Sequence, residues 1–260
     1  MDSDAESFES GAEYQDPTWS PIFRAVMDLD VQALRHELAS GVDVNQRGEG
    51  GATPLYMAVN FRSSYAEEKL QERLECISML LEAGASISNI GRDGTSLHYA
   101  ARNESPAYHP VITLLIKSGA DVNAVNYFGE SVLELAAESG TAGAVRMLIS
   151  AGAVDLDRAL VLAIEHGKQR SCAPLMRAGA AIPAVITAPK PACSTPWEEL
   201  VPTYSQTRAY VERVRATGGF KAYEKAHRQR LTAIFLAKFP ALPVEMLERV
   251  VEFSCDVGGH

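Results

Sequence analysis

A short phrase built around a glycine recurs five times in the first 183 residues of this chain, and this recurrence limits the possible folds more than any other feature. The glycines stand 43, 35, 33 and 27 residues apart, at Gly41, Gly84, Gly119, Gly152 and Gly179. The clearest copy, KSGADVNAVN, follows the apolar run VITLLI. Glycine readily takes the left-handed conformation that ends a helix, so each phrase predicts a helix terminus followed by a loop.

A second phrase precedes each glycine and predicts the start of an earlier helix. Its copies are SPIFRAV, TPLYMAV, TSLHYAA, SVLELAA and RALVLAI, which begin at Ser20, Thr53, Thr95, Ser131 and Arg158. Serine or threonine can cap a helix N-terminus, and a proline after it, as at Pro21 and Pro54, loses no hydrogen bond. Each copy therefore predicts two short helices. One pair has too little apolar surface to fold alone, so the pairs must stack into one continuous core.

The five copies together resemble ankyrin repeats, which have a period of about 33 residues and the signature T-P-L-H-x-A. The resemblance covers residues 18–183 and implies an all-α ankyrin-repeat solenoid, in which helix pairs alternate with β-hairpin loops. The signature histidine is kept at His98, and its place is taken elsewhere by Phe23, Tyr56, Glu134 and Val161. The last copy has Arg158 where a hydroxyl is expected and a short preceding loop, so we expect it to be a degenerate terminal cap.

Two copies depart from the pattern in their second helix. Repeat two carries the insertion NFRSSYAEEKLQER, in which Ser64 and Glu67 form a predicted capping box. We expect it to lengthen the second helix by two or three turns, either as a tolerated surface insertion or as a contact surface. Repeat five has Pro174 inside its second helix, which should shorten or kink that helix.

Composition divides the rest of the chain. The first sixteen residues hold six acids and no Lys or Arg, so we expect residues 1–17 to be a disordered acidic tail. Residues 184–202 are proline-rich and read as an extended linker. Residues 203–260 should form a helical C-terminal segment. Its basic stretch 220–239 precedes an acidic one, which favours pairing between the two, or a solvated face, over nucleic-acid binding.

The C-terminal phrase LPVEMLERVVEF permits two interpretations. It resembles the opening of an F-box, a motif that binds the adaptor of a cullin-type ubiquitin ligase. The residues that match are Leu242, Pro243, Glu245, Leu247 and Val250. Alternatively, the C-terminal helices are a small appendage that packs on repeat five and hides its apolar end.

Catalysis is the function for which the sequence gives the least support. The six histidines are scattered, and no P-loop, G-x-S-x-G or HExxH motif occurs. We therefore predict a protein that is not an enzyme and has no cofactor or metal. The net charge of -9 disfavours nucleic acid as a partner. No apolar run is long enough for a membrane span and no signal peptide is present, so we expect an intracellular monomer, cytoplasmic or nuclear, without a membrane partner.

Recognition of another protein is the predicted function. The resemblance implies that the partner lies in a concave groove made of hairpin tips and the exposed side of the first helices. The positions at the tips are Arg47, Glu49, Ile90, Arg92, Asn126, Tyr127 and Phe128. Those on the helices are Asn60, Arg102, Glu138 and Glu165. Adjacent aromatics on a loop favour a binding hot spot, although Phe128 could instead pack beneath the hairpin.

Overall fold

The computed structural model describes residues 20–48, 51–60, 69–88, 94–186, 197–238 and 246, and twelve helices lie in this part of the chain. Ten of them form five consecutive pairs. The pairs are α1 (Pro21–Met27) with α2 (Val31–Ala39), α3 (Pro54–Asn60) with α4 (Leu70–Glu82), α5 (Ser96–Arg102) with α6 (Tyr108–Lys117), α7 (Val132–Ser139) with α8 (Ala142–Ser150), and α9 (Leu156–Glu165) with α10 (Gln169–Ala178).

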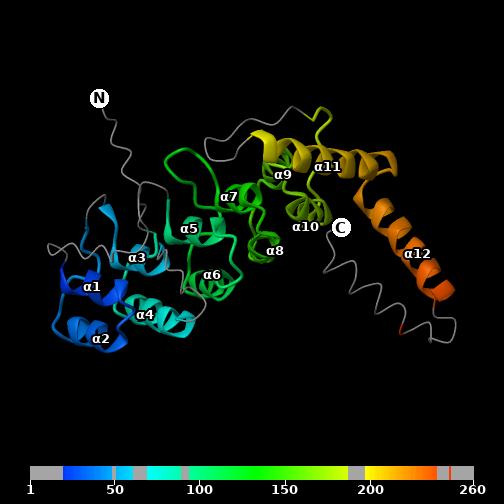
Figure 1. Cartoon of the computed structure of the whole chain (residues 1–260). Helices are drawn as coiled ribbons and strands as arrows, with labels where there is room; N and C mark the ends of the chain where they lie inside the picture. The colour runs from blue at the N-terminus through cyan, green and yellow to red at the C-terminus, as the bar shows by residue number, and fades with distance from the viewer. Residues whose placement is uncertain are drawn as a thin grey trace, which may run out of the picture.

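The pairs stack side by side into a single elongated array (Figure 1). The first helices of successive pairs pack against one another, as do the second helices. Small residues on the first helices permit this close approach and are fully buried; they are Ala58, Ala100, Ala101, Ala136, Ala137 and Ala163. The predicted solenoid and its continuous core are therefore confirmed.

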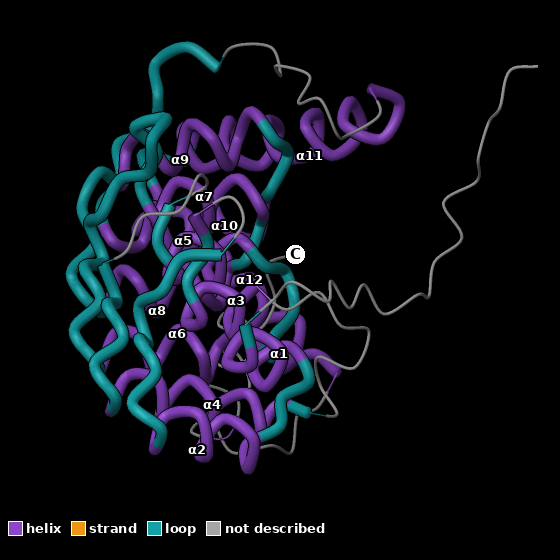
Figure 2. The backbone as a smooth tube through the Cα atoms, turned by 90° about the vertical axis from the view of Figure 1, so that its left-hand side faces the viewer, coloured by secondary structure: helices purple, strands orange, loops and turns teal. Residues whose placement is uncertain are grey.

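Each of the five repeated glycines lies just after a second helix and in a left-handed conformation. Their φ angles are 80° at Gly41, 89° at Gly84, 91° at Gly119, 92° at Gly152 and 108° at Gly179. A Cβ atom added at any of them would have no heavy atom within 4 Å. Glycine is thus required at these positions by the backbone and not by crowding. The loops that follow the helices line one side of the array (Figure 2).

Side-chain amides in these loops tie neighbouring repeats together. Asn45 donates to the carbonyl of Gly84 at 3.0 Å and accepts from the N–H of Ser86 at 2.7 Å. Asn123 makes the same two bonds between repeats three and four, to Gly152 at 3.3 Å and Val154 at 2.9 Å. The D-V-N phrase shared by repeats one and three is therefore a link between stacked units.

Two predictions about the second helices do not match the structure. Helix α4 has 13 residues and begins at Leu70, whereas the other second helices have 9 or 10 residues. The lengthening is thus about one turn and not two or three; Ser64 and Glu67 lie outside the described residues. Helix α10 is not shortened. It has ten residues, and Pro174 is buried within it.

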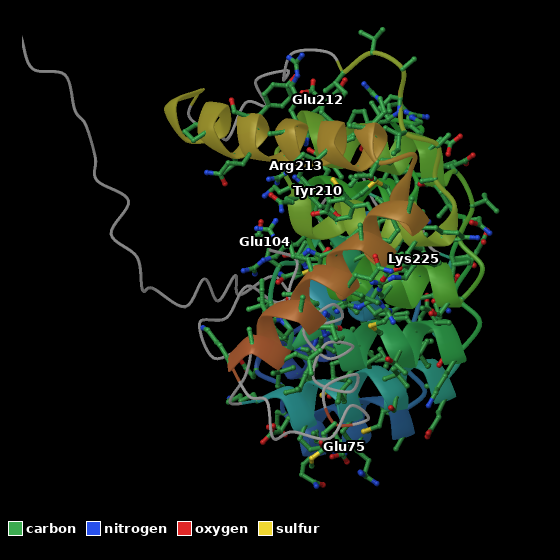
Figure 3. All side chains as sticks on the ribbon, turned by 90° about the vertical axis from the view of Figure 1, so that its right-hand side faces the viewer. Glu75, Glu104, Tyr210, Glu212, Arg213 and Lys225 are labelled. Atoms are coloured by element: carbon green, nitrogen blue, oxygen red, sulfur yellow. The ribbon has the colours of Figure 1, made fainter. Side chains whose placement is uncertain are left out.

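Two long helices cover the end of the array. Helix α11 (Trp197–Ala216) packs against α9 and α10, and α12 (Phe220–Lys238) packs against α10 and α11. α11 begins six residues before the end of the expected linker and contains Pro202. Its buried side chains are Tyr204, Thr207, Tyr210, Val211 and Val214. Figure 3 shows Tyr210 on the side of α11 that faces repeat five. The appendage therefore covers the apolar end of the array, as the second interpretation expects.

Candidate partner-binding surface

The loop between repeats three and four presents two exposed aromatic side chains. Tyr127 is 86% exposed and Phe128 is 65% exposed. Their rings meet edge to face, with centroids 5.7 Å apart. The alternative that Phe128 packs beneath the hairpin is therefore wrong. The expected β-hairpin is itself reduced here to one isolated antiparallel bridge between Val125 and Ser131.

Asn126 holds this loop in shape from the inside. Its side chain is only 7% exposed. The amide oxygen accepts from the backbone N–H of Phe128 at 2.9 Å and of Glu130 at 3.0 Å, and the amide nitrogen donates to the Glu130 carboxylate at 2.8 Å. Gly129 takes the positive φ of 76° that closes the turn. Asn126 was expected to contact a partner, and the structure gives it this internal role; asparagine three residues before glycine is a typical turn pattern that indicates it.

Polar residues stand at or near the C-terminal ends of the first helices. Arg102, the last residue of α5, is exposed. Glu138 near the end of α7 is half-buried, and its carboxylate lies 3.5 Å from Nδ1 of His166 in the next repeat. Lys168 reaches further, to the carboxylate of Glu104 at 3.5 Å. Polar contacts between repeats thus occupy part of the expected polar surface.

Three further expected contact residues lie in the part of the chain that the structure describes, and the others do not. Arg47 is exposed on the first loop, and Asn60 and Glu165 are half-buried at the ends of α3 and α9. Three expected tip residues lie outside the described residues, namely Glu49, Ile90 and Arg92. So do the five residues expected to bind an adaptor, Leu242, Pro243, Glu245, Leu247 and Val250. The described surface is therefore centred on the third loop.

A family model described as "Ankyrin repeats (3 copies)" matches residues 22–126 and again 97–184. These two matches together span more than half of the chain and coincide with the five helix pairs. The chain belongs to the ankyrin repeat family.

Curated relatives share the repeats over part of their length. "Ankyrin repeat and SOCS box protein 11" of Homo sapiens is 30% identical over 153 residues, which is 59% of this chain and 43% of that protein. "B-cell lymphoma 3 protein homolog" of Mus musculus is 36% identical over 126 residues, which is 47% of this chain and 25% of that protein. The chain thus spans less than half the length of these relatives. Ankyrin repeats generally mediate protein–protein interaction.

Ankyrin repeats four and five replace two signature residues with a matched pair. Glu134 stands at the histidine position and is 2% exposed, and Arg158 stands at the hydroxyl position of the next repeat. The Arg158 guanidinium lies 3.1 Å from the Glu134 carboxylate. Glu134 also accepts from the N–H of Ser131 at 3.1 Å, as His98 does from Thr95 in repeat three. Burial raises the pKa of Glu134, and the bond from Ser131 and the charge of Arg158 oppose that rise.

A buried arginine fills the stack between ankyrin repeats two and three. Arg73 of α4 is fully buried, with its guanidinium over the ring of Tyr108 at 5.3 Å. Tyr99 continues the cluster at 6.4 Å from Tyr108, and Tyr56 lies 6.0 Å from Tyr99. The burial of Arg73 could not be predicted from the sequence, because the ring of Tyr108, which contacts its guanidinium, comes 35 residues later in the chain. This cluster stabilises the array and does not form part of the third-loop surface.

The described residues offer little for chemistry. Among them no group of three or more His, Cys, Asp or Glu side chains could hold a metal ion. Burial raises the pKa of Cys76 to about 11 and that of Cys172 to about 12, so neither thiol is poised as a nucleophile. In the same part of the chain, no helix combines the length and apolarity needed to cross a membrane.

Proposed function

We propose that this ankyrin array binds a partner protein through the groove side of its repeats, with Tyr127 and Phe128 as the anchoring side chains. The exposure of both rings on a turn held by Asn126 is the observation that carries the proposal. Exposed aromatic rings supply large contact area, and aromatic residues are enriched among interface hot spots. A turn that is already ordered loses little further entropy on binding.

Polar residues of the first helices form the rim of the proposed surface. Arg102 and Glu138 stand at the ends of the first helices of repeats three and four. Charged groups at an interface rim mainly influence specificity and association rate, whereas a buried aromatic anchor contributes most of the affinity. We therefore expect substitution of the aromatic pair to weaken partner binding more than substitution of Arg102 or Glu138.

Cross-linking and mass spectrometry from cell extract test the proposal. The intact chain is compared with a Tyr127→Ala, Phe128→Ala double variant, and Val185→Ala serves as the control because Val185 is also exposed but follows α10. We expect the double variant to lose one or more partners that the Val185→Ala variant keeps. An unchanged set of partners in the double variant would exclude the third loop as the anchor.

A second candidate function is that of a substrate-recognition adaptor of a cullin-type ubiquitin ligase. It is supported by the F-box-like residues 242–250, and by relatives whose name joins ankyrin repeats to a further module, the SOCS box. Removal of residues 239–260 tests it. Loss of ligase subunits from the cross-linked set, with partners of the third loop retained, is the expected result. Retention of every partner would contradict the adaptor role.

A further inference from the structure

A largely apolar stripe of side chains on one face of α12 is buried at the start of the helix and exposed near its end. The stripe consists of Phe220, Tyr223, His227, Leu231 and Ile234, at the three- and four-residue spacing that places side chains on one face of a helix. Phe220 is buried, the next three residues are partly buried, and Ile234 is 43% exposed. The same face that packs on the array at its start is therefore open at its end.

Contacts with the array are found at the start of α12. Arg177 of α10 donates to the Glu224 carboxylate at 2.8 Å and places its guanidinium 5.8 Å from the centre of the Phe220 ring. Tyr210 of α11 meets Tyr223 edge to face at 5.7 Å. Beyond this region, α12 runs away from the stacked pairs (Figure 1). The bare end of the stripe therefore follows from the direction of the helix.

The bare end of the stripe lies in a basic surrounding. α12 carries five basic residues, Lys221, Lys225, Arg228, Arg230 and Lys238. Glu224, its one acidic residue, already pairs with Arg177 and lies 3.5 Å from Arg228. Arg230 is exposed beside Ile234, one helical turn earlier. A segment that covers Ile234 should therefore be apolar on one side and acidic on its edge.

The chain itself supplies such a segment three residues after α12 ends. In residues 242–253, Val244, Leu247 and Val251 repeat at helical spacing, and Glu245, Glu248 and Glu252 repeat beside them. We propose that residues 242–253 form an amphipathic helix that docks antiparallel on the end of α12, from Leu231 to Lys238. A connection of three residues is typical of antiparallel neighbouring helices.

The short tether favours this occupant over any other molecule. Two segments joined by a few residues meet at an effective concentration in the millimolar range, far above that of a second copy or a partner. The opposite charges of the two segments contribute in the same direction. The docked helix would also bury Leu247, which belongs to the F-box-like motif.

Hydrogen exchange of the full chain, followed by mass spectrometry, tests the proposal with a matched pair of variants. Ile234→Glu places a charge on the stripe, and Leu236→Glu places the same charge two residues further along the chain, off the stripe, where the side chain is 41% exposed. We expect peptides from 242–253 to exchange about tenfold faster in Ile234→Glu than in the unaltered chain. Leu236→Glu should leave their exchange unchanged. Exchange within α9 and α10 reports whether either variant has disturbed the array.

Several results would overturn the proposal. Residues 242–253 could exchange at the unprotected rate in the unaltered chain, or the two variants could act equally. Protection that rises with protein concentration would show that a second copy covers α12. Protection that appears only after addition of a binding protein would assign the stripe to that partner.

A charge reversal would support the proposal. If Arg230→Glu alone loses the protection of residues 242–253, an Arg230→Glu, Glu248→Arg double variant should restore it.

Discussion

Glu134 and Arg158 show how a departure from the repeated phrase is compensated at the level of single residues. A carboxylate buried at the signature-histidine position would be costly alone. Arg158 lies 24 positions later in the chain, and stacking of repeats four and five brings its guanidinium within 3.1 Å. Both departures are visible in the sequence. Their pairing could not be predicted, because the sequence does not tell which positions of adjacent repeats face each other.

The raised pKa of Glu134 predicts a dependence of stability on pH. As the pH falls, the native carboxyl binds its proton before the unfolded one does, whose ordinary pKa is 4.5. The free energy of unfolding should therefore rise as the pH falls from the native pKa towards 4.5, relative to a Glu134→Gln variant. Urea unfolding of both proteins between pH 7 and pH 4 measures this difference. A difference that does not change with pH would contradict the prediction.

Arg158 should matter most when Glu134 is ionised. An Arg158→Ala variant leaves the buried carboxylate without its cation, and we expect a loss of about 1–3 kcal/mol of unfolding free energy at neutral pH. The loss should shrink as the pH falls and Glu134 becomes protonated. Urea unfolding at both ends of the pH range checks it. An equal loss at both ends would mean that the arginine contributes packing and not charge.

Gly119 permits a test of backbone strain without steric crowding. Its φ is 91°, and an added Cβ atom would meet no heavy atom within 4 Å. A Gly119→Ala variant should lose about 1–2 kcal/mol of unfolding free energy, because an L-residue is strained at this φ. Gly119→Asn should lose less, since asparagine tolerates the left-handed region better. Equal losses in urea unfolding would point to a cause other than φ.

At the scale of helices, the sequence predicts the start and end of an element best when a residue at that position marks it, such as a proline at the start or a glycine after the end. Pro21 and Pro54 begin α1 and α3, and the glycines follow the second helices. The length of α4 and the unbroken α10 were not predicted. Pro174 is accommodated as a buried residue inside α10, and burial of this kind cannot be inferred from the spacing of residues along one helix.

The link made by Asn123 is a prediction at this scale. An Asn123→Ala variant removes both hydrogen bonds to the loop that follows repeat four, and we expect a loss of about 1–2 kcal/mol together with faster exchange of the Val154 amide. Ser150→Ala is the control, because the Ser150 hydroxyl bonds only within α8, to the carbonyl of Arg146 at 2.8 Å. Similar exchange at Val154 in both variants would argue against a link between repeats.

At the scale of the whole molecule, the row of repeats was predictable and the detail of its surface was not. Five copies of two phrases predict stacking whichever residues fill them. The contact surface depends instead on single loops: Tyr127 and Phe128 are both exposed, although the sequence left open whether Phe128 packs beneath the hairpin, and Asn126 is buried. The covering of repeat five by α11 was left open by the sequence, because the spacing of apolar residues within α11 does not tell which surface they pack against.

Removal of the covering helices should affect the array from one end only. A chain that ends at Ile186 lacks α11, whose side chains Tyr210, Val211 and Val214 are buried against repeat five. Burial of side chains of this size contributes about 1.5–3 kcal/mol each, so the local stability of α9 and α10 should fall by about 3 kcal/mol or more. In a solenoid each unit contacts only its neighbours, so amide exchange should accelerate strongly in α9 and α10 and little in α1 and α2. A chain that ends at Lys238 keeps both covering helices and should exchange like the full chain in α9 and α10. Uniform acceleration along all five repeats after truncation at Ile186 would mean that the array unfolds as one unit, and that α11 stabilises the whole row.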